Sequence, residues 1–282
     1  MENIYMLLEM LLPFEWVEHT FMKNAFLAVL LVTPLFGILS TMVVSNRMAF
    51  FSDSLGHGAF TGIALGAILG MGSPLASLII FSLVFALLIT YIKNNSRTSA
   101  DTVIGVFSST AVAVGLMLMS RGGGFNKFSS YLIGDILSIT PEDLAALLLV
   151  FIVVVTAWAF LFNRLLVLSI NASFAGSRGI HVFLTESLFA ALLAVVVAVS
   201  IQWVGILIIN SLLVLPAAAA RNAASGVKEY HLFSVGTAMI SGVTGLISAY
   251  YFNMAAGAAI VAAAAVIFFA TWMLRGKFLN KT

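Results

Sequence analysis

The chain contains no cysteine, few charged residues and little proline, and these absences exclude whole classes of protein. Without cysteine there is no disulfide, no thiolate metal site and no cysteine nucleophile. Only 9% of the 282 residues are charged and 62% are hydrophobic. Soluble globular domains have about 25% charged and about 45–50% apolar residues, so a folded water-soluble protein is excluded. The net charge of +2 gives no indication of nucleic-acid binding, because the basic residues lie at the edges of apolar runs.

Long apolar runs dominate the rest of the sequence, each about 17–23 residues, the length of a helix that crosses a bilayer. Solid apolar blocks favour helices over a membrane barrel, whose strands alternate in hydropathy. We predict an all-α, polytopic membrane protein with eight or nine transmembrane helices. The expected spans are 25–45, 57–72, 74–92, 102–119, 144–162, 184–201, 204–220, 232–250 and 255–274. The span 57–72 is short, which is typical of a partial or re-entrant helix.

Basic residues follow every second expected span, and this spacing predicts the topology. The positive-inside rule places these connections and the C-terminus in the cytoplasm. The loop 120–143 falls on the other side although it carries Arg121 and Lys127. The residues that support the assignment are Arg47, Lys93, Arg97, Arg164, Arg178, Arg221, Lys228, Arg275, Lys277 and Lys281.

Residues 1–22 combine four glutamates with leucine, methionine and aromatic residues. They lack the basic start and the small-residue cleavage site of a signal peptide. We therefore expect an N-terminal segment, 1–22, that lies in the membrane interface, followed by a transmembrane domain over 23–282.

Asp53 and His57 are the strongest candidates for chemistry, because ionisable groups within apolar spans are costly and default to functional roles. Their i, i+4 spacing puts a carboxylate and an imidazole on one helix face, about 5–6 Å apart at Cβ. This donor pair suits zinc, manganese or iron better than magnesium or calcium. The structural alternative is that Asp53, Ser52 or Ser54 caps the helix while His57 bonds a carbonyl.

Other polar or small residues have simpler interpretations. Thr140, Pro141, Glu142 and Asp143 form a helix N-terminus, and Asp135 is expected in a turn or a cap. The remaining histidines lie in interfacial segments or loops, where ligation is not expected; they are His19, His181 and His231.

Glycine recurs every four residues through the short span 57–72. This spacing predicts a ridge against which another helix packs, or else a narrow path for a solute. The residues are Gly58, Gly62, Gly66 and Gly70.

The segment 169–182, Ser-Ile-Asn-Ala-Ser-Phe-Ala-Gly-Ser-Arg-Gly-Ile-His-Val, joins two long spans on the expected cytoplasmic side. Phe174 and Ile180 stand among small residues, a pattern compatible with docking into a groove of a partner. An ordinary connecting loop is the alternative.

Four strings, in order along the chain, resemble the metal-transporting ABC-3 family of permeases, the membrane subunits of bacterial zinc, manganese and iron importers. The first is Arg-Met-Ala-Phe-Phe-Ser-Asp-Ser-Leu-Gly-His-Gly-Ala at 47–59, and the second is Asp-Thr-Val-Ile-Gly at 101–105. The strings at 131–143 and 204–221 are most similar to the zinc-uptake branch.

The resemblance implies the permease subunit of an ATP-driven importer of divalent transition metal ions, zinc favoured over manganese or iron, in the bacterial cytoplasmic membrane. It implies no catalysis by this chain and no permanently bound cofactor. The implied partners are a second copy of the chain, two ATP-binding subunits and an extracytoplasmic metal-binding solute-binding protein. An ion-coupled secondary metal transporter is the main alternative, and an intramembrane enzyme that uses Asp53 and His57 as acid and base is a more remote one.

The resemblance also assigns residues. Asp53 and His57 match the polar pair of the metal path, and 169–182 matches the region that rests on the ATPase. The coupling residues implied there are Asn171, Phe174, Ala175, Gly176, Arg178 and Gly179.

Overall fold

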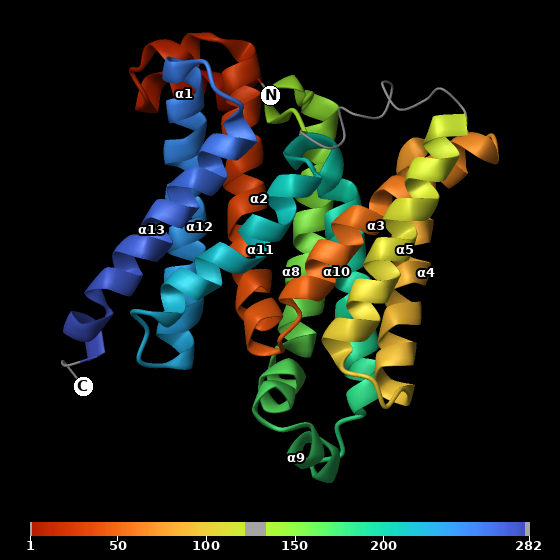
Figure 1. Cartoon of the computed structure of the whole chain (residues 1–282). Coiled ribbons are helices and arrows are strands. Elements are labelled where there is room, and N and C mark those ends of the chain that lie inside the picture. Colours follow the sequence, from red (N-terminus) through yellow and green to blue (C-terminus); the bar gives the residue numbers. More distant parts are fainter. Residues whose placement is uncertain (1, 122–133, 280–282) are drawn as a thin grey trace. The chain divides into compact units, whose positions relative to one another are not determined.

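The computed structural model describes residues 2–121 and 134–279, and every regular element in these two stretches is a helix (Figure 1). The chain divides into two compact units, described separately below. Unit 1 comprises Met1–Thr41, Gly134–Val153 and Trp203–Thr282, and unit 2 comprises Met42–Ile133 and Val154–Gln202. The helices α2, α8 and α10 each begin in one unit and end in the other.

Unit 1 contains the two ends of the chain and three helices that pack on one another, α11, α12 and α13. Its elements are α1 (Glu2–Leu11), η1 (Glu15–Glu18), most of α2 (Thr20–Ser45), η2 (Ile136–Ser138), the start of α8 (Pro141–Ile170), α11 (Ile206–Arg221), α12 (Val227–Phe252) and α13 (Ala256–Leu279).

Close helix crossings in unit 1 depend on glycine. A Cβ on Gly245 of α12 would lie 2.4 Å from the Cα of Ile260 on α13, so only glycine permits this approach. Pro216 lies within α11, and the next amide, of Ala217, donates to Ser40 Oγ of α2 at 3.0 Å. This side-chain acceptor supports the backbone beside a residue that lacks its own N–H group.

Unit 2 is built around α3 (Ala49–Ile68), which packs against both α4 (Pro74–Asn95) and α5 (Ala100–Arg121) (Figure 1). The unit also contains the end of α8, the short helix α9 (Ala172–Ser177) and most of α10 (Val182–Val204). The expected glycine ridge is confirmed for Gly58, Gly62 and Gly66, which face Phe85, Phe81 and Ser77 of α4. Gly70 follows the end of α3 with φ +66, and a Cβ there would meet no atom within 4 Å, so its assignment to the ridge was wrong.

Seven helices in the described residues are long and apolar enough to cross a membrane. They are α2, α4, α5, α8, α10, α12 and α13. The expected total of eight or nine is not reached, because α3 and α11 are not among the seven. α11 has 16 residues and is therefore about 24 Å long, less than the hydrocarbon thickness of about 30 Å.

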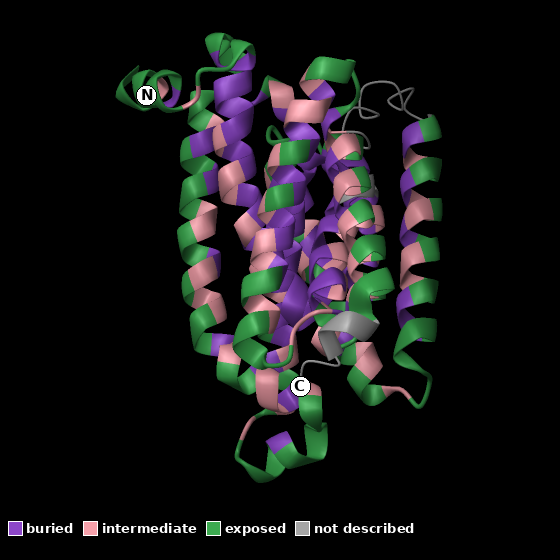
Figure 2. Cartoon of the chain, turned by 90° about the vertical axis from the view of Figure 1, so that its left-hand side faces the viewer, coloured by how far each residue is buried: buried purple, intermediate pink, exposed green. Residues whose placement is uncertain are grey.

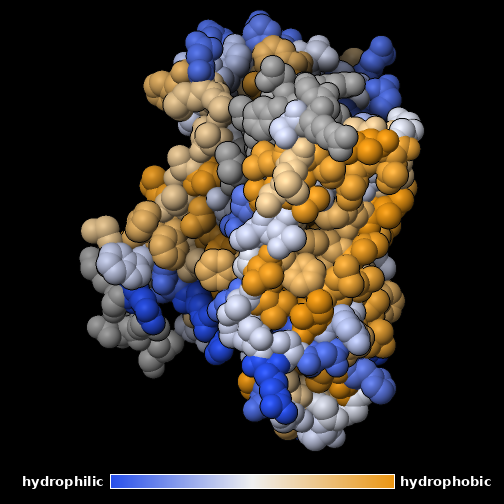
Figure 3. All heavy atoms as spheres, turned by 45° about the vertical axis from the view of Figure 1, so that its right-hand side comes forward, coloured by the Kyte–Doolittle hydropathy of each residue, from blue (hydrophilic) through white to orange (hydrophobic). Residues whose placement is uncertain are grey.

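Large apolar side chains are exposed along the outer faces of these helices, as a lipid environment requires. On α4 and α5, for example, Val84, Val106 and Met117 are each more than half exposed. Figure 2 shows buried residues along the inner helix faces and exposed residues outside, and Figure 3 shows hydrophobic atoms over much of the visible face.

Within each unit, basic connections expected on one side of the membrane lie at one end. In unit 1, α1 and η1, which carry Glu2, Glu9, Glu15 and Glu18, lie at the end where α12 passes into α13 (Figure 1). The C-terminal end of α11, whose last turn includes Arg221, lies at the opposite end of the unit. In unit 2, the α4–α5 connection with Arg97 lies at the same end as α9. The grouping of basic connections expected from the sequence therefore holds within each unit.

Candidate functional site

Asp53 and His57 lie within the first turns of α3, which begins at Ala49 and not at the expected residue 57. The N-cap residue is Met48, and no side chain caps the helix. The hydroxyls of Ser52 and Ser54 donate to carbonyls of their own helix, Ala49 O at 2.7 Å and Phe51 O at 2.8 Å. The interpretation of Asp53, Ser52 or Ser54 as a cap was therefore wrong, because all three lie past the start of the helix.

Asp53 and His57 lie on the one accessible side of an otherwise buried stretch of α3. We call this accessible side the open strip. Ser52, Ser54 and Leu55 are at most 1% exposed. The side chains of Asp53 and His57 are each 39% exposed, and they alone within residues 51–59 are not buried. Within residues 51–59 the folded chain thus buries the apolar and small side chains of α3 and leaves its two ionisable side chains accessible.

The separation of the two donor atoms suits a shared cation. His57 Nε2 lies 3.6 Å from Asp53 Oδ1, too far for a hydrogen bond. Two ligand atoms, each about 2.1 Å from one ion at a tetrahedral angle, lie about 3.4 Å apart. The side chains therefore need almost no rearrangement to bind one ion together.

Within the described residues, no group of three or more His, Asp or Glu side chains converges on a metal-sized site. In the described part of a single copy, Asp53 and His57 therefore offer two donor side chains, fewer than a complete metal site needs. An ion held by two protein donors keeps water or other weak ligands, which favours brief binding over permanent retention.

Within the segment 169–182, residues Ala172–Ser177 form the short helix α9, which is capped at each end. The side chain of Asn171 accepts from the amide of Phe174 at 3.0 Å and so caps the N-terminus of α9. At the other end Gly179 has φ +76, a conformation that glycine adopts without strain. The side chain of Phe174 is 45% exposed, with the Arg178 guanidinium 5.2 Å from its ring centre, whereas Ala175 is buried.

The simpler interpretations of other acids are confirmed. Asp143 accepts from the amide and the hydroxyl of Thr140, whose Oγ1 accepts in turn from the amide of Asp143, so the two residues form a capping box at the start of α8. Asp135 Oδ1 accepts from the amide of Leu137 at 3.1 Å and caps η2.

No pattern in the sequence predicted one ion pair near α9. Lys93 on α4 and Glu186 on α10 are separated by 93 positions, and their side-chain atoms approach to 2.9 Å. Lys93 entered the sequence analysis only as a basic residue beside a span, and Glu186 was not considered. Pairing over such a separation depends on how the helices pack, which no local pattern reveals.

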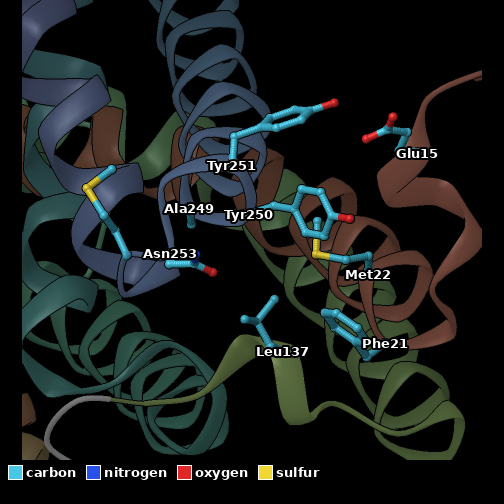
Figure 4. A pocket seen from close by; sticks show the side chains of 9 residues that line it. Glu15, Phe21, Met22, Leu137, Ala249, Tyr250, Tyr251 and Asn253 are labelled. Atoms are coloured by element: carbon cyan, nitrogen blue, oxygen red, sulfur yellow. The ribbon is translucent and has the colours of Figure 1, made fainter.

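Unit 1 contains a separate cavity of about 540 Å³ (Figure 4). Its lining comes from η1, the start of α2, η2 and the connection from α12 to α13. The lining residues with polar side chains are Glu15, Tyr250, Tyr251 and Asn253. The cavity contains none of the residues that the sequence singled out for metal or coupling roles.

Comparisons with known proteins agree along most of the chain. The model of the ABC 3 transport family matches residues 18–275. The manganese import system permease protein ScaB of Streptococcus gordonii is 31% identical over 260 residues, 92% of this chain and 93% of that protein. The high-affinity zinc uptake system membrane protein ZnuB of Haemophilus influenzae is 30% identical over 220 residues, 78% of this chain and 84% of that protein.

A solved structure has the same fold. PsaBC from Streptococcus pneumoniae in complex with Fab contains a chain that superposes with a TM-score of 0.78 at 29% identity. The match covers 96% of this chain and 95% of that one, so it extends over nearly the whole fold described above.

Proposed function

Since the chain belongs to the ABC 3 transport family, it is the permease subunit of an ATP-driven importer of divalent transition metal ions, and we propose that Asp53 and His57 line the ion's path. The chain is a multi-pass protein of the bacterial cytoplasmic membrane and not an enzyme, because ATP is hydrolysed by a separate subunit.

The observation that carries the metal-path proposal is the open strip on α3. A carboxylate and an imidazole remain accessible on a helix that is buried around them, and their donor atoms are 3.6 Å apart. Burial of unpaired ionisable groups in a membrane is costly, so the accessible side must face water, an ion or both. Desolvated ions would bind the pair briefly and leave when the path opens to the other side.

Uptake of radiolabelled zinc and manganese by the assembled transporter tests this role. Asp53→Asn and His57→Gln keep side-chain volume but weaken one ligand each, and uptake should fall by at least about tenfold. Glu142→Gln, which removes one exposed carboxylate from the first turn of α8, is the control and should transport normally. Normal uptake by both α3 variants would contradict the metal-path role, and failure of both to accumulate in the membrane would indicate a structural role.

Zinc is the favoured cargo. One imidazole nitrogen and one carboxylate oxygen bind zinc more tightly than manganese in the general order of divalent affinities. Competition between the two ions for uptake is the test: excess zinc should suppress manganese uptake more strongly than the reverse. Equal suppression would contradict the preference for zinc, and stronger suppression by manganese would assign the path to manganese.

The exposed face of α9 is the proposed contact with the ATP-binding subunit. Phe174 presents an aromatic ring beside the Arg178 guanidinium, on a helix held in shape by Asn171 and Gly179. A buried carboxylate would be costly in a groove that accepts the ring, so Phe174→Asp should separate the subunits or uncouple hydrolysis from uptake. Phe174→Tyr keeps the ring and serves as the control. An intact complex with normal uptake from Phe174→Asp would place coupling elsewhere.

The proposed assembly is a homodimer above two ATP-binding subunits, supplied by an extracytoplasmic metal-binding solute-binding protein. Each copy would have nine membrane helices, the seven long ones together with α3 and α11, and residues 1–22 would lie in the interface. The exposed Met6, Leu7 and Met10 of α1 support an interfacial position.

The basic ends of both units would then face the cytoplasm. The chain has no cysteine, so a single cysteine at Ser177 reports its side without background. It should resist impermeant thiol reagents in intact cells and react after the cells are opened. Ready labelling in intact cells would show that Ser177 lies outside the cytoplasm and that the proposed topology is wrong.

A further inference from the structure

The short helix α9 has a hydrogen-bonded end that lies close in the chain to the start of α10. The amide of Gly179 donates to Gly176 O at 3.0 Å, and the amide of Ile180 donates to Ala175 O at 3.1 Å. These two bonds, with glycine in the left-handed conformation, make a Schellman ending. Only His181 then precedes the first residue of α10, so a displacement of α9 must also move the first turns of α10.

Glu186, in the second turn of α10, binds the end of α4. Its Oε2 accepts from Lys93 Nζ at 2.9 Å and from Asn94 Nδ2 at 2.8 Å. The side chains of Lys93 and Glu186 are 25% and 17% exposed, so water screens the ion pair only in part. Close to these residues, the rings of Tyr91 and Phe183 meet edge to face, with centroids 6.4 Å apart.

The same helix, α4, packs so closely against α3 that there is no space for a Cβ on the facing glycines of α3. A Cβ on Gly62 would lie 2.8 Å from Phe81 Cβ, and a Cβ on Gly66 would lie 2.4 Å from Ser77 Cβ. Both values are below the contact distance of about 3.5 Å between carbon atoms. Gly58, the first member of the ridge, directly follows His57. A displacement of α4 toward α3 must therefore displace the helix that carries Asp53 and His57.

We infer that Glu186 is a positioning residue that transmits movement of α9, through α4, to Asp53 and His57. The inference rests on the proposed roles of α9 and of the α3 pair. All the elements involved belong to unit 2, so the route follows contacts within one compact body. Glu186 does not contact the ion; it makes the cytoplasmic ends of α10 and α4 move together, so that ATP-driven movement reaches the metal path.

The test measures metal uptake and ATP hydrolysis together in proteoliposomes that contain the complete transporter. In Glu186→Ala, the number of ions moved per ATP should fall by about fivefold or more, while hydrolysis continues. Glu186→Gln keeps an acceptor for Asn94 but loses the charge and should have an intermediate ratio. Glu142→Gln, which also removes one carboxylate, should leave the ratio unchanged.

Reversal of the pair separates positioning from simple folding. Lys93→Glu combined with Glu186→Lys restores opposite charges at the same place, and the double variant should recover most of the coupling lost in Glu186→Lys alone. A ratio that is normal in Glu186→Ala, or equally low in the reversed pair and in Glu186→Lys, would overturn the inference. Should Glu186→Ala fail to accumulate, Glu186→Gln and the reversed pair, which keep the side-chain bulk, decide the question.

The proposed metal path and this inference fail in different ways. If Asp53→Asn transports normally, the metal-path proposal is wrong, and movement of α9 does not control transport through Asp53 and His57. If Asp53→Asn loses uptake while Glu186→Ala keeps a normal ion-to-ATP ratio, the metal path stands and only the route through Glu186 is wrong.

Discussion

The glycine ridge of α3 leads to a prediction about packing that can be worked from the structure. An alanine Cβ at Gly66 would lie 2.2 Å from Ser77 Oγ and 2.4 Å from Ser77 Cβ. Carbon atoms in contact are about 3.5–4.0 Å apart, so the deficit is about 1 Å or more. The hydroxyl can rotate away, but the Cβ is fixed to the backbone of α4, and the helices must separate. Such overpacking costs about 1–3 kcal/mol.

The other ridge positions should respond less. At Gly58 the nearest atoms belong to the ring of Phe85, which swings more easily than a backbone moves. Gly105 on α5 is the control, because a Cβ there would meet nothing within 4 Å. Alanine at that helical position should stabilise by about 0.5–1 kcal/mol.

Thermal unfolding of the purified variants at one scan rate measures these differences. The apparent Tm should be lowest for Gly66→Ala, higher for Gly58→Ala, and at or above the wild-type value for Gly105→Ala. Separation of α3 from α4 should also reduce metal uptake by Gly66→Ala more than by Gly105→Ala. Equal Tm values for the Gly66→Ala and Gly105→Ala variants would refute the close approach of the two helices.

Three further predictions concern other contacts. Gly245→Ala should lower the apparent Tm, since its Cβ would meet the backbone of α13, whereas Gly236→Ala on the same helix has no neighbour within 4 Å and should not. Ser40→Ala removes the acceptor for the amide of Ala217 and should cost about 0.5–1.5 kcal/mol by the same assay. Thr140→Ala removes the N-terminal cap of α8 and should cost about 1 kcal/mol, with faster hydrogen exchange confined to the first turn of that helix.

Local patterns explain what could be predicted from the sequence. The helix N-terminus at Thr140 was predicted because an N-cap residue, a proline and acidic residues of the first turn follow one another in the sequence. The reciprocal bonds of Thr140 and Asp143 are a finding of the structure. The ridge at Gly58, Gly62 and Gly66 was identified from its period of four. The hydropathy of the long runs likewise located most helices to within a few residues, since bilayer thickness sets their length.

The errors and omissions have physical causes. The start of α3 was placed too late because the apolar run begins only at residue 57, whereas the helix already begins at Ala49 and the hydroxyls of Ser52 and Ser54 bond to it. Gly70 fitted the period of four but follows the end of the helix with φ +66. The pairing of Lys93 with Glu186 depends on the packing of α4 beside α10, so the sequence around either residue does not predict it.

The central claim is that Asp53 and His57 hold the ion as it crosses the membrane. Pulsed electron paramagnetic resonance of Mn²⁺ bound to the assembled transporter tests it most directly, with isotopically labelled histidine in the permease alone and the solute-binding protein removed. We predict a hyperfine coupling from one histidine nitrogen that disappears in His57→Gln. The same coupling in His57→Gln, or bound Mn²⁺ with no nitrogen coupling in the wild type, would contradict the claim.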